Sequence, residues 1–462
     1  MTRAGPYCAW LRCAVSIDVP RPAGGTSCPI RPTDRSRLRA QVSAPHLLAG
    51  CLAQSLNPTN TRQQRQQPLL LPLNLQASSR RPTRTRTHNG PSVAAAPNSP
   101  GEMSSRQACG IIITIMAAGG YERLPLAHAN QIVLPLTIAH ECGQAFRWRR
   151  VAVAARQGYR LEWSLCLPDR VVFLQHDPEA QCLYHRSEYS GKPGPTSTAD
   201  WLRSYLNLDK PTTEWYKEWC ERDPIFARHA ARFAGVCILR QDPWECMCSF
   251  ICSSNNNIPR ISQMVHKLCD YFTAPLLTYT YPKDARRAIS TRGEICSDEP
   301  QEPIEYHPFP PPTRLAMHDI EPLLRELGFG YRAKFLAGTA KELCERAKTQ
   351  LKSEGKATDD DHINTAVHAY LESLRSLGYY ESRDALMEFL GIGPKVAECV
   401  VADSCIALMS LDQHSSIPVD RHVFNFADRW YGIRKKRYEE VADRLREIWG
   451  DRAGWAHSVS PH

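Results

Sequence analysis

The segment Leu390–Ala397, with the sequence LGIGPKVA, decides the fold, because two glycines separate two apolar stretches. Residues 382–390 and 394–411 have the length and apolar spacing of helices, so the segment predicts a helix, a glycine turn and a second helix. Without a Cβ, Gly391 and Gly393 let backbone N–H groups approach a phosphate closely. The sequence therefore predicts a hairpin that grips a nucleic-acid backbone without reading its bases.

Two side chains near this hairpin have complementary chemistry. Lys395 lies in the first turn of the second predicted helix, where the positive helix end and partial burial favour a neutral, nucleophilic amine. Asp420 follows Pro418 and can cap a new helix, while its carboxylate can stabilise positive charge on a sugar as a base departs. Together they predict cleavage of a base from its sugar. For Lys395 alone, a simple phosphate contact is the alternative.

Two further segments carry residues suited to DNA. Ser253–Arg260 reads SSNNNIPR, and asparagine and arginine side chains can contact exposed base edges, although we expect at least one asparagine to cap a helix. In Gly328–Lys334, Tyr331 stands beside Arg332, a pair suited to wedging into a base stack. A core aromatic at a helix start is the alternative. His422 is interpreted either as a phosphate contact or as a surface histidine.

The charge of the chain is unevenly distributed. Residues 1–110 contain fourteen Arg, no Lys and three acidic residues, a net charge of +11, so the +9 of the whole chain leaves 9 − 11 = −2 for the rest. Total charge is therefore no argument for nucleic-acid binding. We interpret residues 1–115 as a disordered tail rich in Arg, Pro and Ser. Its composition is also compatible with a mitochondrial transit peptide, so we expect a nuclear protein with the mitochondrion as a second destination.

The remaining sequence predicts two domains. Residues 116–239 mix strands and helices, with strands expected at 131–136, 159–163 and 170–174. Residues 240–462 are predominantly helical, interrupted by a polar, proline-rich loop insertion at about 282–312. Helices are predicted at 200–206, 211–220, 258–272, 317–327, 331–348, 361–377, 382–390, 394–411, 422–430 and 438–449.

The cysteines do not indicate a metal site. Eighteen are scattered without a paired CxxC, and the close group Cys246, Cys248 and Cys252 is interpreted as buried free thiols. We predict no metal ligands, and reduced thiols favour an intracellular compartment. Because apolar stretches stay shorter than about 18 residues, a membrane span is not expected.

In combination these segments resemble the helix-hairpin-helix DNA glycosylases, specifically the 8-oxoguanine glycosylase and abasic-site lyase family. The resemblance covers roughly residues 132–459 and rests on the motifs CGQAFRW from Cys142, RQDP from Arg240, the Ser249–Arg260 segment, GYRA from Gly330, the glycine hairpin and PVD ending at Asp420. It implies an N-terminal TATA-binding-protein-like α+β domain followed by an all-α helix-hairpin-helix domain. It also implies double-stranded DNA containing 8-oxoguanine as partner, a monomer and no cofactor.

The resemblance also implies roles for individual residues. Lys395 matches the lysine that attacks the sugar and forms a Schiff base, and Asp420 matches its carboxylate partner. The other roles concern recognition of the damaged base, of the opposite cytosine and of DNA phosphates. Gly143, Cys399, Phe250 and His457 match positions around the lesion base; Asn255, Arg260 and Arg332 match readers of the cytosine; Tyr331 matches the wedge; and Gly391, Gly393 and His422 match phosphate contacts.

Three features depart from the family's pattern. The interval between Lys395 and Asp420 is about six residues longer than is usual in the family, and the extra residues lie near 401–406. In a continuous helix, six added residues would rotate the chain that follows by about 600° about the helix axis. His457 stands where the family has a glutamine, and the family's stacking aromatic beyond it is missing. Arg421 replaces a smaller neighbour of Asp420.

Three functions fit these observations. The leading hypothesis is a bifunctional glycosylase and lyase that excises 8-oxoguanine opposite cytosine. An endonuclease III-like pyrimidine glycosylase is a second, but no cysteine follows Cys405 to form its usual C-terminal cluster. A lesion-binding protein with impaired catalysis is the third, because the surplus residues could displace Asp420 from Lys395.

Overall fold

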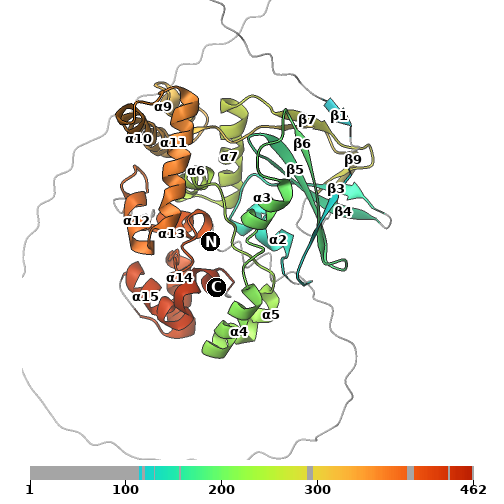
Figure 1. Ribbon diagram of the computed structural model, residues 1–462. Coiled ribbons are helices and arrows are strands. Elements are labelled where there is room, and N and C mark those ends of the chain that lie inside the picture. The colour runs from blue at the N-terminus through green and yellow to red at the C-terminus, as the bar shows by residue number, and fades with distance from the viewer. Residues whose placement is uncertain are drawn as a thin grey trace, which may run out of the picture. The chain divides into compact units, whose positions relative to one another are not determined.

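The protein is described here by a computed structural model, shown in Figure 1. The predicted residues Gly393, Lys395 and Cys399 lie outside the described residues, as do positions 1–113 of the tail. The structure describes residues 114–116, 120–128, 131–155, 158–288, 295–392, 400–434 and 437–459.

Two sheets form the N-terminal part of the protein (Figure 1). The larger has seven antiparallel strands in the order β2-β6-β5-β4-β3-β8-β9, and the smaller has the order β1-β7-β10. The strands are β1 (Thr114–Met116), β2 (Glu122–Pro125), β3 (Arg149–Ala154), β4 (Tyr159–Cys166), β5 (Arg170–Asp177), β6 (Cys182–Tyr189), β7 (Leu277–Thr280), β8 (Arg286–Ala288), β9 (Ile295–Pro300) and β10 (Ile304–Tyr306).

The central strands are buried on both faces, which explains their apolar runs. In β5, Val172 and Leu174 belong to the main core shared with the helices, while Val171 and Phe173 belong to a second core against the small sheet. Successive side chains of a strand point to opposite faces. Phe173 packs against Tyr279 of β7, with ring centroids 4.7 Å apart. The two sheets therefore stack through an aromatic layer.

The expected strand at 131–136 is wrong. Leu134–Thr137 forms the short helix α2, with a proline in its first turn, and η2 (His140–Cys142) follows it. Ile132, Leu134 and Leu136 are nevertheless all buried, which is why the sequence alternates like a strand. Proline fixes a φ angle that suits the first turn of a helix, and here that preference decides the local structure.

The loop insertion predicted at about 282–312 also needs correction. It contains β8, β9 and β10, and β8 pairs with β3 through Val151 and Arg287 while β10 pairs with β7. Part of the predicted helical domain thus completes the sheets of the first domain. Pro300 is the last residue of β9, and Pro303 lies between β9 and β10, which are the edge strands of their sheets, where proline is tolerated.

Helices and the loops between them make up the rest of the described chain, and Figure 1 shows the helices gathered beside the sheets. Most predicted helices are confirmed with shifts of a few residues, and those at 258–272 and 438–449 match in both ends. The helices are α3 (Thr198–Tyr205), α4 (Thr212–Arg222), α5 (Pro224–Phe233), α6 (Pro243–Ser253), α7 (Ile258–Phe272), α8 (Pro312–Leu315), α9 (Ile320–Glu326), α10 (Arg332–Ser353), α11 (Asp360–Ser373), η3 (Leu374–Ser376), α12 (Tyr379–Met387), α13 (Val400–Ser410), α14 (Arg421–Tyr431), α15 (Tyr438–Trp449), η4 (Gly450–Arg452) and α16 (Ala453–Ser458).

The surplus residues near 401–406 lie within α13 and do not loop out. Residues 404–410 of this helix are all buried, so the part of the surplus at 404–406 lies in the core. The reason is composition, because its apolar residues Ile406, Leu408 and Met409 all pack into the main core.

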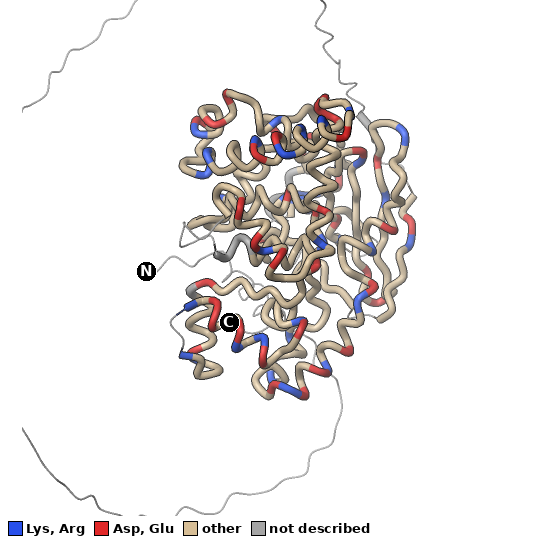
Figure 2. The backbone as a smooth tube through the Cα atoms, turned by 60° about the vertical axis from the view of Figure 1, so that its left-hand side comes forward, with Lys and Arg blue, Asp and Glu red and all other residues tan. Residues whose placement is uncertain are grey.

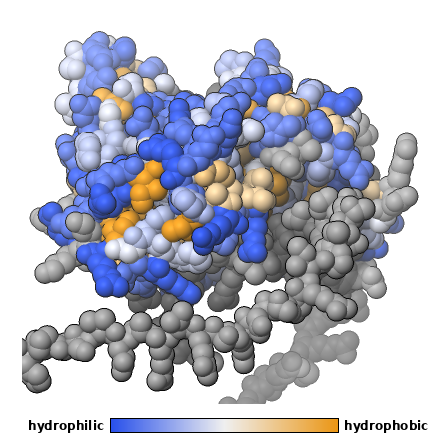
Figure 3. Space-filling view, turned by 90° about the horizontal axis from the view of Figure 1, so that it is seen from below, coloured by the Kyte–Doolittle hydropathy of each residue, from blue (hydrophilic) through white to orange (hydrophobic). Residues whose placement is uncertain are grey.

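Apolar side chains are largely internal, and the surface is mixed in charge. Figure 2 shows basic and acidic positions next to one another along the backbone. On α10, for example, Glu342 and Arg346 form an exposed ion pair. The face in Figure 3 is mainly hydrophilic, with a few apolar patches among the polar residues. Among the described helices, none is long and apolar enough to span a membrane.

A buried ion pair joins the sheets to α6. Arg147 Nε and Nη2 donate to the Glu245 carboxylate over 2.8 and 2.6 Å, and Nη1 donates to the carbonyl of Cys166 at 2.9 Å. The guanidinium side chain is only 5% exposed. The Glu245 carboxylate raises the pKa of Arg147 despite burial, so this charge depends on its partner.

Replacing Glu245 by alanine should lower the free energy of unfolding by about 3–5 kcal/mol, because it leaves the Arg147 charge buried and unpaired. Urea unfolding followed by circular dichroism measures this change. Glu321→Ala is the matched control, since it breaks an exposed pair with Arg325 and should cost about 0–1 kcal/mol. Equal costs for the two variants would contradict the structural role of Arg147.

Candidate active site

Asp420 is the N-cap of α14. One carboxylate oxygen, Oδ1, accepts hydrogen bonds from the backbone N–H groups of His422 and Val423, both at 2.8 Å. This cap satisfies two N–H groups that a helix start otherwise leaves without partners. The carboxylate is partly buried, and its Oδ2 is not used by either cap bond. The capping role predicted from the sequence is confirmed.

Gly391 forms the start of the predicted hairpin and is held by α10. Its φ of +89° is a backbone conformation that favours glycine, and a Cβ added here would meet Cβ and Cγ of Phe335 at 2.6 Å. The hydroxyl of Thr339 donates to the carbonyl of Leu390 at 2.8 Å. A Cβ on Gly338 would likewise meet Leu390 at 2.6 Å. Helix α10 therefore fixes the position of the hairpin turn.

The same helix carries the predicted wedge at its start. Tyr331 is 43% exposed, and its ring packs edge-to-face on Phe335 with centroids 5.7 Å apart. Its hydroxyl donates to the carbonyl of Ser254 at 3.0 Å. Phe335 thus contacts both the wedge and Gly391, so the aromatic wedge and the hairpin are connected through one side chain.

Arg332 holds the backbone of the segment Ser253–Arg260, which contains the three consecutive asparagines. Its side chain is buried, Nε donates to the carbonyl of Ser254 at 3.0 Å, and Nη2 donates to that of Asn255 at 3.1 Å. Asn255 itself is exposed, with a left-handed φ of +44°. As it stands, Arg332 holds the backbone of the segment, while the side chain of Asn255 faces solvent.

The other asparagines and Arg260 complete this cluster. Asn257 caps α7 by accepting from the backbone N–H of Arg260 at 3.1 Å, which confirms that one asparagine is a helix cap. Arg260 is exposed and donates to the carbonyl of Gly328 at 3.2 Å, beside the wedge. The structure thus brings the exposed residues Asn255, Arg260 and Tyr331, which come from two segments far apart in the sequence, onto one surface, while the buried Arg332 bonds the backbone of Asn255.

Gly143 and Phe250 come from two segments that contact each other, the end of η2 with the residues after it and helix α6. Gly143 ends η2 with φ +75°, and the next residue, Gln144, is bound from three directions. Its side chain bonds Cys237 and Leu239, and its carbonyl accepts from Gln241 Nε2 at 2.9 Å. Phe250 is buried and packs edge-to-face on Phe146, three residues after Gly143. The backbone at Gly143 is therefore rigidly placed.

His457 is buried in α16, and that helix lies against the loop before Asp420. The N–H of Gly454 donates to the carbonyl of His414 at 2.9 Å, and the indole N–H of Trp455 donates to His414 Nδ1 at 3.0 Å. A Cβ on Gly454 would meet the carbonyl oxygen of Ser416 at 2.2 Å. Gly454 was not predicted from the sequence, although a glycine at the start of a buried helix indicates that another backbone segment approaches the helix closely.

The close group of cysteines lies in the buried helix α6. Cys246, Cys248 and Cys252 are buried free thiols, as predicted, and burial raises the pKa of Cys252 to about 12. Within the residues that the structure describes, no group of His, Cys, Asp and Glu is arranged to hold a metal ion.

Comparison with known proteins agrees with this geometry. Residues 125–247 match the family described as 8-oxoguanine DNA glycosylase, N-terminal domain. Residues 248–451 match the HhH-GPD superfamily base excision DNA repair proteins. The N-glycosylase/DNA lyase OGG1 of Arabidopsis thaliana is 32% identical over 343 residues, which cover 73% of this chain and 78% of that protein. This chain belongs to the 8-oxoguanine DNA glycosylase family.

Other members support the assignment and the fold class. The N-glycosylase/DNA lyase of Saccharomyces cerevisiae is 31% identical over 365 residues, covering 71% of this chain and 83% of that protein. The apo crystal structure of the Clostridium acetobutylicum 8-oxoguanine glycosylase/lyase has a TM-score of 0.52 at 22% identity and covers 75% of this chain and 98% of that one. This likeness confirms the predicted order of an α+β domain followed by an all-α helix-hairpin-helix domain.

Gly391→Ala should destabilise the protein by about 2–5 kcal/mol, because a left-handed alanine is strained and its Cβ would collide with Phe335. Gly355→Ala is the control, since its φ is +66° but nothing lies within 4 Å of the new Cβ. It should cost only about 1–2 kcal/mol. Denaturant unfolding measures the stability of both variants. Equal losses of stability would show that contact with Phe335 adds nothing to the cost of the Gly391 substitution.

The protein should lose stability in acid partly through His414. Burial lowers the pKa of His414 to about 4, with Lys210, Arg452 and Arg240 adding to the effect and Asp412 opposing it. The unfolded chain, with a histidine pKa near 6.5, takes up the proton first. The contribution of neutral His414 to the free energy of unfolding should therefore be complete above pH 6.5 and should decrease as the pH falls from 6.5 to 4.

His414→Gln removes this titration, so its unfolding free energy should depend less on pH between 6.5 and 4 than that of the wild type. Urea unfolding across this range measures the difference, at most about 1.4 kcal/mol per pH unit for one group. Other histidines with lowered pKa, His266 among them, titrate equally in both proteins. Identical pH profiles would show that His414 titrates normally in the folded state.

Proposed function

We propose that this protein is a bifunctional DNA glycosylase and abasic-site lyase that excises 8-oxoguanine paired with cytosine. The observation that carries the proposal is the identity of 32% to an N-glycosylase/DNA lyase across both domains. The geometry supports it, because Asn255, Arg260 and Tyr331 form one exposed surface connected to the hairpin through Phe335. Double-stranded DNA is the partner that such a surface fits.

The proposed chemistry begins with Lys395 as a neutral amine. Its nitrogen forms a bond to C1′ of the sugar as the bond between C1′ and the base breaks, and the base leaves with the electron pair and takes up a proton. Opening of the sugar ring leaves a Schiff base between Lys395 and C1′. Loss of a proton from C2′ then breaks the bond from C3′ to its phosphate oxygen, which cuts the strand by β-elimination.

Asp420 would stabilise the positive charge that develops on the sugar as the base departs. Its use as a helix cap is compatible with this role, since both cap bonds go to Oδ1. The cap also fixes the carboxylate's orientation, which an electrostatic stabiliser requires. His422 at the start of α14 would contact a DNA phosphate together with the backbone at Gly391 and Gly393.

Recognition of the two bases would use the two sides of the site. We propose that the carbonyl of Gly143 accepts the N7 hydrogen that distinguishes 8-oxoguanine from guanine, with Phe250, Cys399 and His457 around the base. On the other strand, the exposed Asn255 and Arg260 would contact the cytosine while Tyr331 fills the gap left by the flipped base. The buried Arg332 would act by holding the backbone of Asn255.

A lesion-binding protein with impaired catalysis is the second candidate. The observation that favours it is the helical course of the surplus residues in α13, because extra helical residues shift everything beyond them. Binding would then persist through the surface formed by Asn255 and Tyr331, whereas base release would be lost.

Lys395→Gln should abolish strand cutting and the borohydride-trapped adduct on a duplex with 8-oxoguanine opposite cytosine, while leaving lesion binding intact, because the amide cannot form a Schiff base. Asp420→Asn should lower the single-turnover rate of base release by about 10²-fold or more, since it removes the charge. Asparagine caps helices as well as aspartate, so this variant should stay folded.

These variants separate the candidates. An adduct in the wild type that disappears in Lys395→Gln supports the enzyme. Tight lesion binding by the wild type without an adduct or a nick supports the binding protein. Cutting by Lys395→Gln at the wild-type rate would remove this lysine from the mechanism.

A further inference from the structure

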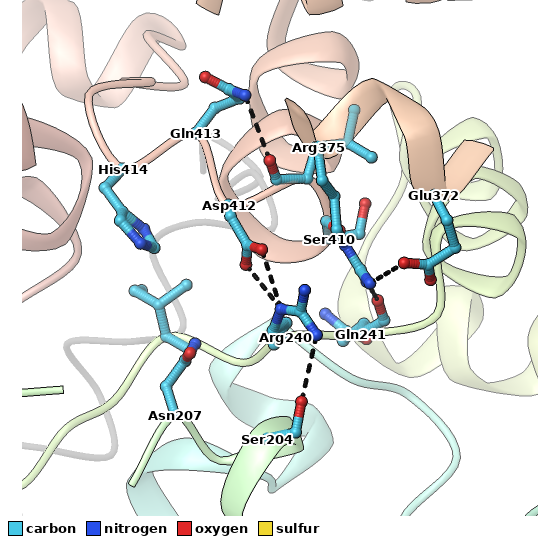
Figure 4. A network of polar contacts seen from close by, with 12 residues as sticks. Ser204, Asn207, Arg240, Gln241, Glu372, Arg375, Ser410, Asp412, Gln413 and His414 are labelled. Atoms are coloured by element: carbon cyan, nitrogen blue, oxygen red, sulfur yellow. Dashed lines mark hydrogen bonds and ion pairs between the residues drawn. The ribbon is translucent and has the colours of Figure 1, made fainter. Parts of the chain in front are cut away.

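A polar network joins the two domains at the start of the loop 411–420 (Figure 4). This loop ends at Asp420, the N-cap of α14. Arg240 stands at its centre, between Asp412 on the loop and Ser204 on α3. Nε of Arg240 donates to both carboxylate oxygens of Asp412 at 2.9 Å, and Nη1 donates to the Ser204 hydroxyl at 3.2 Å. The backbone N–H of Arg240 donates to the carbonyl of Tyr205 at 2.9 Å, which anchors it to the first domain.

The network also satisfies the end of α13. The last carbonyl groups of a helix lack partners within the helix. Here the carbonyl of Met409 accepts from the backbone N–H of Gln241 at 2.8 Å, and that of Ser410 accepts from Arg375 Nε at 2.7 Å. Arg375 Nη2 donates in turn to the carbonyl of Gln241 at 3.0 Å. The segment beside Arg240 therefore fixes the point at which α13 ends and the loop begins.

Asp412 has a backbone conformation that needs support. Its φ of +58° is left-handed, which residues other than glycine, asparagine and aspartate rarely adopt. The ion pair is partly buried, with the side chains of Arg240 and Asp412 32% and 27% exposed. Two residues later, His414 bonds Gly454 and Trp455 of α16. One turn of the loop thus links the first domain to the helix that carries His457.

We propose that Arg240 and Asp412 are positioning residues for base release: their ion pair holds the loop that ends at Asp420 and, through His414, the helix that carries His457. The inference rests on the proposed glycosylase function. Neither residue touches the DNA in this account. Catalysis tolerates little displacement of a reacting group, so loosening the turn should slow base release more than it weakens DNA binding.

Two variants test the pair without straining the backbone. Asp412→Asn keeps the shape and tolerates the left-handed turn, and Asp412→Gly removes the carboxylate at a φ that glycine accepts. Each of these two single variants, and also the single variant Arg240→Gln, should lower the single-turnover rate of 8-oxoguanine release by about 10-fold to 100-fold. Affinity for a duplex carrying an uncleavable abasic-site analogue should stay at the wild-type value. The double variant Arg240→Gln/Asp412→Asn should be no slower than the slower single variant.

Arg160→Gln is the matched control. It breaks an ion pair with Asp177 of similar length, 3.1 Å, and similar exposure, 39% and 22%, between two strands of the large sheet. The control should release the base at the wild-type rate. A normal rate in Arg240→Gln and Asp412→Gly would overturn the proposal, as would a loss of rate in the control equal to theirs.

Amide hydrogen exchange gives a second measurement that does not depend on catalysis. Arg240→Gln and Asp412→Gly should raise exchange in peptides covering 411–420 and 453–459 and leave the strands β4 and β5 unchanged. Unchanged exchange in the loop would overturn the proposal even if the rate falls. An inactive wild-type protein would instead overturn the proposed function, and exchange would still report whether the pair holds the loop.

Discussion

The placement of Asp420 depends on hydrogen bonds that come from outside its own loop. The carbonyl groups that end α13 are satisfied by Gln241 and Arg375, and the turn at Asp412 is held by Arg240. These partners come from the segment that joins the two domains and from η3. The carboxylate that we propose to act beside the Lys395 amine, a role that tolerates little displacement, is thus located by contacts with other elements of the protein.

A second chain of contacts organises the surface that we propose to face DNA. Tyr331 is the N-cap of α10 and Arg332 its first residue, and together they bond the backbone of Ser254 and Asn255, while the next turn carries Phe335, which packs against Gly391. The proposed wedge and the described start of the proposed hairpin therefore both contact one rigid element. We expect insertion of the wedge and grip of the phosphate to be coupled for this reason.

The sequence predicted the order of domains and most helices, because the helices are amphipathic and carry apolar spacing of their own. It failed at 131–136, where a proline turned an alternating segment into a helix, and at 286–306, where polar edge strands carry a weak pattern. Capping chemistry predicted the cap role of Asp420 and of at least one asparagine in the Ser253–Arg260 segment, and the structure identifies that asparagine as Asn257. The Arg240–Asp412 pair could not be found, because its partners are 172 residues apart.

The most direct test of the account is to identify the lysine that reacts. The protein is trapped with borohydride on a duplex carrying 8-oxoguanine opposite cytosine, digested, and the DNA-linked peptide is identified by mass spectrometry. One modified residue is expected, Lys395 in the segment that follows Gly391. Modification of a different lysine, or trapping that is equally strong on undamaged duplex, would overturn the proposed mechanism.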